Sequence, residues 1–163
     1  MNRVNKTELL QQIIATLVAD LDVLTRGAKA AHLAATHEEC VPDNKYDTTA
    51  LEASYIAQGQ ANRAQQIREA LASYQGLTLR GFGDETPVRL TALVTLEAED
   101  GSSKQVFLGP AAGGLKIVAD SGDCLVITPE SPLGRGLLGK CCGDEIELGR
   151  GAGQTSMTIV EVA

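Results

Sequence analysis

Four carboxylates surround a short break between two helical patterns, and they are the first candidates for metal chemistry in this chain. Glu38 and Glu39 precede Pro42, and Asp43 and Asp47 follow it. Asp43 and Asp47 are four residues apart across a predicted turn, so their oxygens could converge on one divalent cation such as Mg²⁺. Structural roles fit as well: Asp47 could favour a helix N-terminus, Asp43 could form a turn after proline, and the glutamates could face solvent. The residues alone leave both readings open.

Other reactive patterns carry weaker signals. His32, His37 and Cys40 lack a fourth converging ligand for a transition metal. The run Gly134–Lys140 has the spacing of a phosphate-binding loop, but Cys141 stands where Ser or Thr is needed, and a Ser-Pro pair precedes the run. The four cysteines include no Cys-x-x-Cys pair, so we expect reduced, structural thiols.

Two heptad patterns predict the elements that position the acidic segment. In the first, Leu and Ile give way to Ala toward the break; in the second, Ala gives way to larger residues after it. The rows are Leu10, Leu17, Leu24 and Ala31 with Ile14, Leu21, Ala28 and Ala35, then Ala50, Ala57, Ala64 and Leu71 with Ala53, Gln60, Ile67 and Tyr74. This spacing predicts an antiparallel helical hairpin, a coiled coil whose alanines face each other at a slim, dry tip near residues 40–48.

Local signals predict the bounds of these two helices. The first should begin near Asn5 or Thr7 and run to about Glu39, with a bend or fraying near its internal glycine. The second should begin at a capping box with Thr49 as N-cap and run to about Gln75. Residues 1–75 are therefore expected to form a helical domain.

After Gly76 the apolar spacing becomes typical of strands. The predicted strands are Val88–Leu96, Gln105–Leu108, Leu115–Val118, Cys124–Thr128, Asp144–Leu148 and Met157–Val162. Asp100-Gly101 predicts a hairpin turn, and Ser131-Pro132 predicts the N-cap and first residue of one short helix. The fold class is thus α+β: a helical hairpin followed, over residues 76–163, by a small, mainly antiparallel sheet domain with one short helix.

Composition limits the classes of partner. The chain of 163 residues has a net charge of −7, and residues 76–163 carry 7 Lys and Arg against 12 Asp and Glu. A direct binder of duplex DNA needs a basic face, whereas acidic charge suits a basic protein surface or metal ions. Neither a signal peptide nor an 18-residue apolar run appears, so we expect a cytoplasmic protein that does not enter membranes. We also expect it to be a monomer.

The order of these motifs resembles the bacterial Gre transcript-cleavage factors, GreA and GreB. The resemblance is carried by residues 131–140 (SPLGRGLLGK), by Gly143-Asp144-Glu145 and by residues 159–162 (IVEV), after a hairpin of matching length and position. It extends over essentially the whole chain. It implies a sheet domain like that of the FK506-binding prolyl isomerases. Isomerase activity is not expected, because Phe82 and Phe107 are the only aromatic residues of that half and cannot line a pocket.

The resemblance implies a transcription elongation factor that binds RNA polymerase in its secondary channel and stimulates cleavage of backtracked RNA. The polymerase performs the hydrolysis, so the factor is not itself an enzyme. Asp43 and Asp47 would take the catalytic and metal-binding roles by holding a Mg²⁺ of the polymerase active site, which the free protein does not bind. Nascent RNA would be met only within that complex. The residues implied in polymerase binding are Ser131, Pro132, Leu133, Gly134 and Arg135.

The sequence departs from the Gre pattern in the acidic segment. The family has a Glu three residues after the Asp, whereas Tyr46 follows Asp43 at that distance and Asp47 comes one residue later. This difference keeps a second function open, a non-cleaving Gre paralogue that inhibits or regulates RNA polymerase through the same channel. A third reading, of a different class, is a coiled-coil interaction module for another protein.

Overall fold

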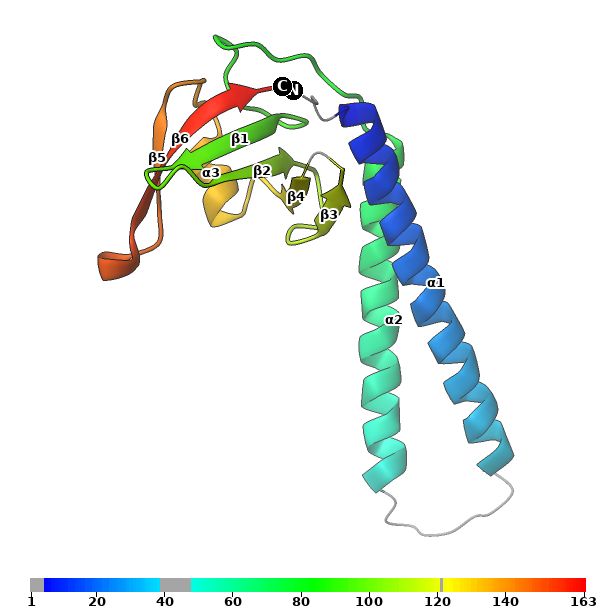
Figure 1. Ribbon diagram of the computed structural model, residues 1–163. Coiled ribbons are helices and arrows are strands. Elements are labelled where there is room, and N and C mark those ends of the chain that lie inside the picture. Colours follow the sequence, from blue (N-terminus) through cyan, green and yellow to red (C-terminus); the bar gives the residue numbers. More distant parts are fainter. Residues whose placement is uncertain (1–4, 39–47, 121) are drawn as a thin grey trace. The chain divides into compact units, whose positions relative to one another are not determined.

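The chain folds into two compact units. The computed structural model describes residues 5–38, 48–120 and 122–163 (Figure 1). Ile14–Ala72 form the helical unit, and Met1–Ile13 together with Ser73–Ala163 form the sheet unit. The predicted α+β fold, a helical pair followed by a mainly antiparallel sheet, is confirmed.

Two long helices form the described part of the helical unit, and the first residues of one and the last residues of the other belong to the sheet unit. Helix α1 spans Lys6–Glu38 and helix α2 spans Thr48–Gln75. The Asn5 side chain accepts a hydrogen bond of 3.0 Å from the backbone N–H of Thr7, so Asn5 caps α1 as one of the two predicted starts. Helix α1 continues without interruption past its internal glycine. Helix α2 begins at Thr48, one residue before the predicted cap Thr49.

The helical unit is packed along only part of its length. Leu17, Ala64, Ile67 and Ala70 are buried. The predicted dry alanine tip is wrong for the described residues near it, because Ala28, Ala53 and Ala57 are all exposed. Figure 1 shows α1 and α2 separating toward residues 39–47. An alanine methyl buries little apolar area, so a run of alanines provides little hydrophobic driving force for contact between these helices.

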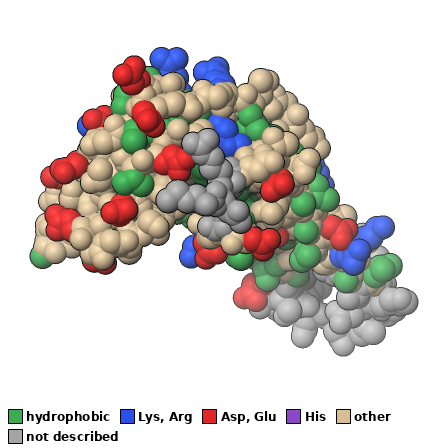
Figure 2. Space-filling view, turned by 45° about the horizontal axis from the view of Figure 1, so that its top comes forward, with side chains coloured by type: hydrophobic (Ala, Val, Ile, Leu, Met, Phe, Trp, Pro, Cys, Tyr) green, Lys and Arg blue, Asp and Glu red, His purple; other side chains and the backbone are tan. Residues whose placement is uncertain are grey.

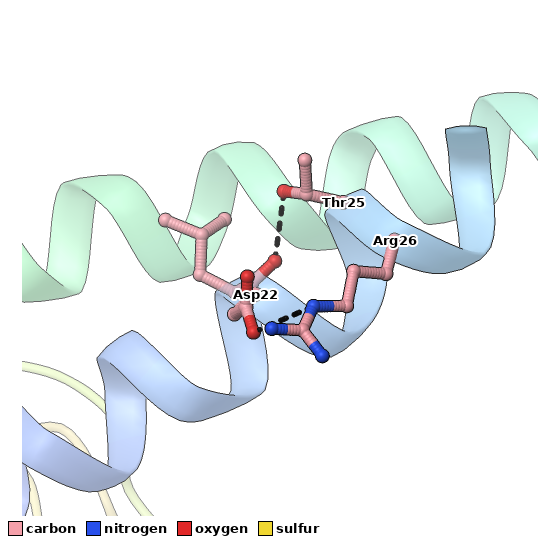
Figure 3. A network of polar contacts seen from close by, with 4 residues as sticks. Asp22, Thr25 and Arg26 are labelled. Carbon is pink, nitrogen blue, oxygen red and sulfur yellow. Dashed lines mark hydrogen bonds and ion pairs between the residues drawn. The ribbon is translucent and has the colours of Figure 1, made fainter.

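The surface of α1 carries a small local network of polar side chains (Figure 3). Arg26 Nε lies 3.0 Å from Asp22 Oδ2, one helical turn earlier, and the Thr25 hydroxyl donates a 2.8 Å hydrogen bond to the carbonyl of Leu21. Both charged side chains are more than half exposed, so solvent screens the pair and its contribution to stability is small.

The sheet unit contains a six-stranded sheet in the order β3-β4-β2-β1-β6-β5. Its strands are β1 Leu93–Ala98, β2 Ser103–Leu108, β3 Lys116–Ala119, β4 Gly122–Ile127, β5 Glu145–Leu148 and β6 Thr155–Val162, with helix α3 at Pro132–Leu137 and the short 3₁₀ helix η1 at Gly151–Gly153. Neighbouring strands are antiparallel except β2 and β4, which pair in parallel. The predicted turn is confirmed: Gly101 has φ 82°, and Asp100 accepts a 2.8 Å bond from the Ser102 backbone N–H.

The first predicted strand begins later than expected. Val88–Ala92 lie outside β1, which starts at Leu93. Thr91 interrupts the extended pattern because its φ is 77°, in the left-handed region that β-branched residues avoid. The apolar spacing of this segment reflects burial instead of strand geometry, since Val88, Thr91 and Ala92 are all buried.

One main cluster of aliphatic side chains forms the core of the sheet unit. It gathers residues of the segment before β1 and of β1, β2, β4, β5, β6 and α3, as follows: Val88, Ala92, Val94, Leu96, Val106, Leu108, Ile127, Leu137, Ile146, Met157, Ile159 and Val162. Phe107 is also fully buried but lies next to Val106 on β2, so it points to the other face of the sheet. Leu9, Ile13 and Tyr74, from the ends of α1 and α2 in this unit, are buried as well.

Candidate functional site

Helix α3 and its N-terminal turn hold the residues implied in polymerase binding. Ser131 caps the helix in an extended conformation and accepts a 3.0 Å hydrogen bond from the N–H of Gly134. Its hydroxyl also donates a 2.7 Å bond to the carbonyl of Thr128. Pro132 occupies the first turn, where no backbone donor is needed. The predicted cap is confirmed, and the Ser131 hydroxyl is engaged in hydrogen bonds within the protein.

The five residues implied in polymerase binding differ in solvent exposure. Pro132 and Arg135 are exposed, Ser131 and Leu133 are half-buried, and Gly134 is buried. Leu133 packs against the core cluster. A Cβ on Gly134 would lie 1.9 Å from the carbonyl oxygen of Thr128, so the helix approaches that backbone too closely for any larger residue. A partner can therefore reach Pro132 and Arg135 directly, while the other three shape the helix beneath them.

Two exposed neighbours extend this surface beyond the residues that the sequence singled out. Glu130 is exposed just before the cap, and Leu138 is 40% exposed just after the helix. We call Glu130, Pro132, Arg135 and Leu138 the α3 face. The sequence did not mark Leu138 as a surface residue, because an apolar residue next to Leu137 is typical of a core. Its exposure follows from the end of the helix at Leu137.

Backbone hydrogen bonds fix the α3 face on the sheet unit. The N–H of Val88 donates to the carbonyl of Lys140 at 2.8 Å, and the N–H of Gly139 donates to the carbonyl of Val88 at 3.0 Å. Gly139 has φ 80°, so a glycine is required where the chain reverses after the helix. This two-way pairing makes the α3 face a rigid feature of the fold.

The cysteines are structural in the part of the chain that the structure describes. Cys124, Cys141 and Cys142 are free thiols. Burial raises the pKa of the Cys124 thiol to about 12, which keeps it protonated and unreactive at neutral pH. Cys141 and Cys142 are half-buried, and their sulfurs lie 3.7 Å and 3.2 Å from the carbonyl oxygens of Glu85 and Val160. These contacts agree with the expected reduced thiols.

The predicted metal ligands Asp43 and Asp47 lie outside the described residues. Their assignment therefore stays a prediction from the sequence. Over residues 5–38, 48–120 and 122–163, no group of three or more His, Cys, Asp or Glu side chains is placed to hold a metal ion. In the same ranges, no helix has the length and apolar character to cross a membrane.

Acidic side chains predominate on the visible surface. In Figure 2, red carboxylates are spread widely over the face shown, and blue Lys and Arg side chains are fewer. This matches the excess of 21 Asp and Glu over 14 Lys and Arg in the sequence. Such a surface does not favour direct contact with the phosphate backbone of nucleic acid.

Comparisons with known proteins address the sheet unit most directly. Residues 84–163 match the family described as "Transcription elongation factor, GreA/GreB, C-term". The matched segment includes all six strands and the α3 face. Curated protein sequences give no significant match.

Several solved structures are similar to this chain at low identity. The GreA factor homolog 1 (Gfh1) protein of Thermus thermophilus is 18% identical with a TM-score of 0.37, over 92% of this chain and 94% of that one. Thermus aquaticus Gfh1 is 20% identical with a TM-score of 0.38, over 91% and 92% of the two chains. A prokaryotic transcription elongation factor GreA/GreB from Nitrosomonas europaea is 23% identical with a TM-score of 0.35, over 59% and 78%.

These structural likenesses are too low to carry an argument, so the assignment rests on the sequence family. The matched residues hold the capped helix, its buried Gly134 and the turn at Gly139, the local features from which the α3 face is built. Residues 84–163 therefore belong to the C-terminal domain family of the GreA/GreB transcription elongation factors.

Proposed function

We propose that this transcription elongation factor binds RNA polymerase at its secondary channel and stimulates cleavage of backtracked RNA. One observation carries the proposal: the GreA/GreB match over residues 84–163 coincides with a rigid, exposed α3 face on the sheet unit. The α3 face is the docking surface, through Pro132 and Arg135 above all. The protein acts as a monomer and meets nascent RNA only inside the polymerase complex.

The length of helices α1 and α2 suits such a role. Helix α1 has 33 residues and helix α2 has 28, so at 1.5 Å per residue they are about 50 Å and about 42 Å long. A pair of helices of this length can carry the segment between them far from a docked surface. The acidic residues of that segment are then the groups delivered to the polymerase.

Asp43 and Asp47 are the proposed ligands of a Mg²⁺ ion of the polymerase active site. Carboxylate oxygens are the donor type that Mg²⁺ takes, so the residue types fit. Two carboxylates do not complete a Mg²⁺ site, so the free protein should not hold the ion. The bound ion supplies charge stabilisation and an activated water for hydrolysis. Within this proposal the hydrolysis belongs to the polymerase, and the factor is not an enzyme.

One sequence feature favours a second function. Tyr46 stands three residues after Asp43, where the Gre pattern has its glutamate. A factor with an incomplete pair of acids would occupy the channel without supporting cleavage. In that case the protein inhibits or regulates the polymerase.

A transcript-cleavage assay on a backtracked RNA polymerase complex decides between stimulation of cleavage and inhibition of the polymerase. For the first function, wild type raises cleavage by the polymerase above its level without factor, and Asp43→Asn lowers the stimulated rate at least ~10-fold, equal to about 1.4 kcal/mol of barrier. For the second, wild type gives no stimulation but still binds, and Tyr46→Glu gains cleavage. Equal stimulated cleavage by wild type and Asp43→Asn would exclude Asp43 as the ligand.

Docking is tested separately by charge reversal on the α3 face. Arg135→Glu should weaken binding to RNA polymerase in a pull-down, because it replaces an exposed cation by an anion at the proposed contact. Arg150→Glu is the matched control, since Arg150 is also an exposed arginine of the sheet unit but lies outside the α3 face. Equal binding by the two variants would remove the α3 face as the docking surface. Leu133 is unsuitable for this test because it also packs in the core.

A further inference from the structure

Lys6, the first residue of α1, makes an unusual set of contacts for a lysine. Its Nζ donates a 3.0 Å hydrogen bond to the carbonyl of Thr91 and a second bond to the carbonyl of Arg80. The same ammonium group lies 4.7 Å from the centre of the Phe82 ring. All four residues belong to the sheet unit, so these contacts join the first turn of α1 to the connection before β1.

The ammonium group is partly withdrawn from solvent where it makes these contacts. Burial lowers the pKa of Lys6 below its ordinary value, because desolvation disfavours the charged form. Exposed lysines usually keep their charged end in water. Two carbonyl acceptors and an aromatic face compensate for lost hydration here, so Lys6 has a defined position and not a mobile surface one.

Thr91 is the centre of this junction, and its backbone is strained. It is 1% exposed and has φ 77°, an outlier for a β-branched residue. Each of its polar groups is engaged. Its N–H donates to the carbonyl of Leu108 at 2.8 Å, its hydroxyl accepts from the N–H of Arg80 at 3.0 Å, and its carbonyl accepts from Lys6. Such a conformation persists only where its surroundings hold it.

We propose that Lys6 is a positioning residue that fastens the first turn of α1 to the sheet unit, so that α1 is carried along when that unit docks. The proposal rests on the proposed function, in which the sheet unit docks and the helices deliver the acidic segment. Helix α1 is continuous from Lys6 to Glu38, so its first turn is one point at which the sheet unit constrains that helix. Tyr74 is the corresponding anchor at the end of α2, with its hydroxyl donating a 2.7 Å bond to the carbonyl of Ala111.

Three variants test this role. Lys6→Met keeps an unbranched side chain of similar length but removes the charge and the donors. Lys6→Arg keeps a cation that can donate to two carbonyls and stack on Phe82. Lys29→Met is the matched control, because Lys29 is an exposed lysine on the same helix and its loss changes the net charge equally.

The first measurement is RNA cleavage as a function of factor concentration. Lys6→Met should lower the rate at saturation at least ~10-fold while the half-saturating concentration stays within about 2-fold of wild type, because the docking surface is untouched and only positioning is lost. Lys6→Arg should restore most of the rate, and Lys29→Met should behave as wild type. A Lys6→Met variant with the wild-type saturated rate, or one that loses affinity alone, overturns the positioning role.

The second measurement is hydrogen exchange of the free proteins, which does not depend on cleavage. Residues 6–13 should exchange at least ~10-fold faster in Lys6→Met than in wild type, with β1 and β2 unchanged. Unchanged exchange in residues 6–13 overturns the proposal. If wild type stimulates no cleavage, the proposed function fails while this measurement still decides whether Lys6 fastens α1. If Lys6→Met does not fold, Lys6→Gln, which keeps side-chain donors but loses the charge over the Phe82 ring, is judged by the same exchange, and faster exchange of residues 6–13 is again expected.

Discussion

The contact between Gly109 and Tyr74 allows a sharp test of how α2 is anchored in the sheet unit. A Cβ on Gly109 would lie 2.1 Å from the Tyr74 hydroxyl oxygen, 3.0 Å from Cζ and 3.3 Å from Cε1. Tyr74 is fully buried, so its ring cannot swing into solvent without giving up its packing. Gly109→Ala must therefore displace the ring, and with it the hydrogen bond from the hydroxyl to Ala111.

The expected cost follows from these distances. Overpacking of this kind costs about 1–3 kcal/mol, and the lost hydrogen bond adds about 1 kcal/mol. Gly109→Ala should thus lower the free energy of unfolding by about 2–4 kcal/mol. Tyr74→Phe alone should cost about 1 kcal/mol, because it removes the donor and keeps the ring.

The double variant separates the steric clash from the loss of the hydrogen bond. Tyr74→Phe removes the atom at 2.1 Å but leaves the ring carbons at 3.0 Å and 3.3 Å. Gly109→Ala with Tyr74→Phe should therefore cost about 1–2 kcal/mol less than the sum of the single changes. Urea denaturation, followed by circular dichroism, measures the free energy of unfolding of the two single variants and of the double variant.

Gly83→Ala is the control for this cycle. The nearest atom to its added Cβ is 3.8 Å away, an ordinary contact, so its effect should stay within about 0.5 kcal/mol. A Gly109→Ala variant as stable as Gly83→Ala, or strict additivity in the double variant, would refute the clash with Tyr74.

Two further predictions concern stability. Gly27→Ala and Gly59→Ala should each raise helix stability by about 1 kcal/mol, since both glycines lie inside helices with open space where the Cβ would go; unchanged urea midpoints would contradict this. The free energy of unfolding should fall as pH rises from 9 toward about 12. Burial raises the folded-state pKa of Cys124 from 9.0 to about 12, so only the unfolded state loses that proton in this window. Burial also raises the pKa of Tyr74, which adds to the loss above pH 10, whereas the lowered pKa of Lys6 acts in the opposite sense. Cys124→Ala should flatten the decline in alkaline denaturation curves, and an unchanged slope would show that Cys124 does not contribute.

Features set by neighbouring residues could be predicted from the sequence. Asn5 as one of two helix starts, the cap at Ser131 and the turn at Asp100-Gly101 each depend on hydrogen bonds or dihedral angles within a few residues. For the same reason the resemblance around residues 131–140 identified the segment that exposes the α3 face. These signals are local, and local geometry repeats between proteins.

Features that depend on distant contacts could not be predicted. The alanine rows suggested a closed tip, but their burial depends on whether two separate helices stay together, and Ala53 and Ala57 are exposed. The left-handed backbone of Thr91 interrupts an apolar pattern that looked like a strand. Leu9 and Ile13 are buried as part of the sheet unit, and no spacing within α1 marks that role. Asp43 and Asp47 remain predictions of the sequence.

The division of the sheet unit between the two ends of the chain bears on how the protein is made. Lys6 and Thr91 are 85 positions apart, with the entire helical unit encoded between them. At 5–20 residues per second, a ribosome needs about 4–17 s to add Thr91 after Lys6. During that interval Leu9 and Ile13 have left the ribosome, or are leaving it, before the rest of the sheet unit in which they become buried has been made. The helices can form early because their hydrogen bonds are local, whereas the N-terminal turns of α1 must wait for the sheet. Newly made chains therefore pass through a stage in which the long helices are present and their attachment to the sheet unit is not.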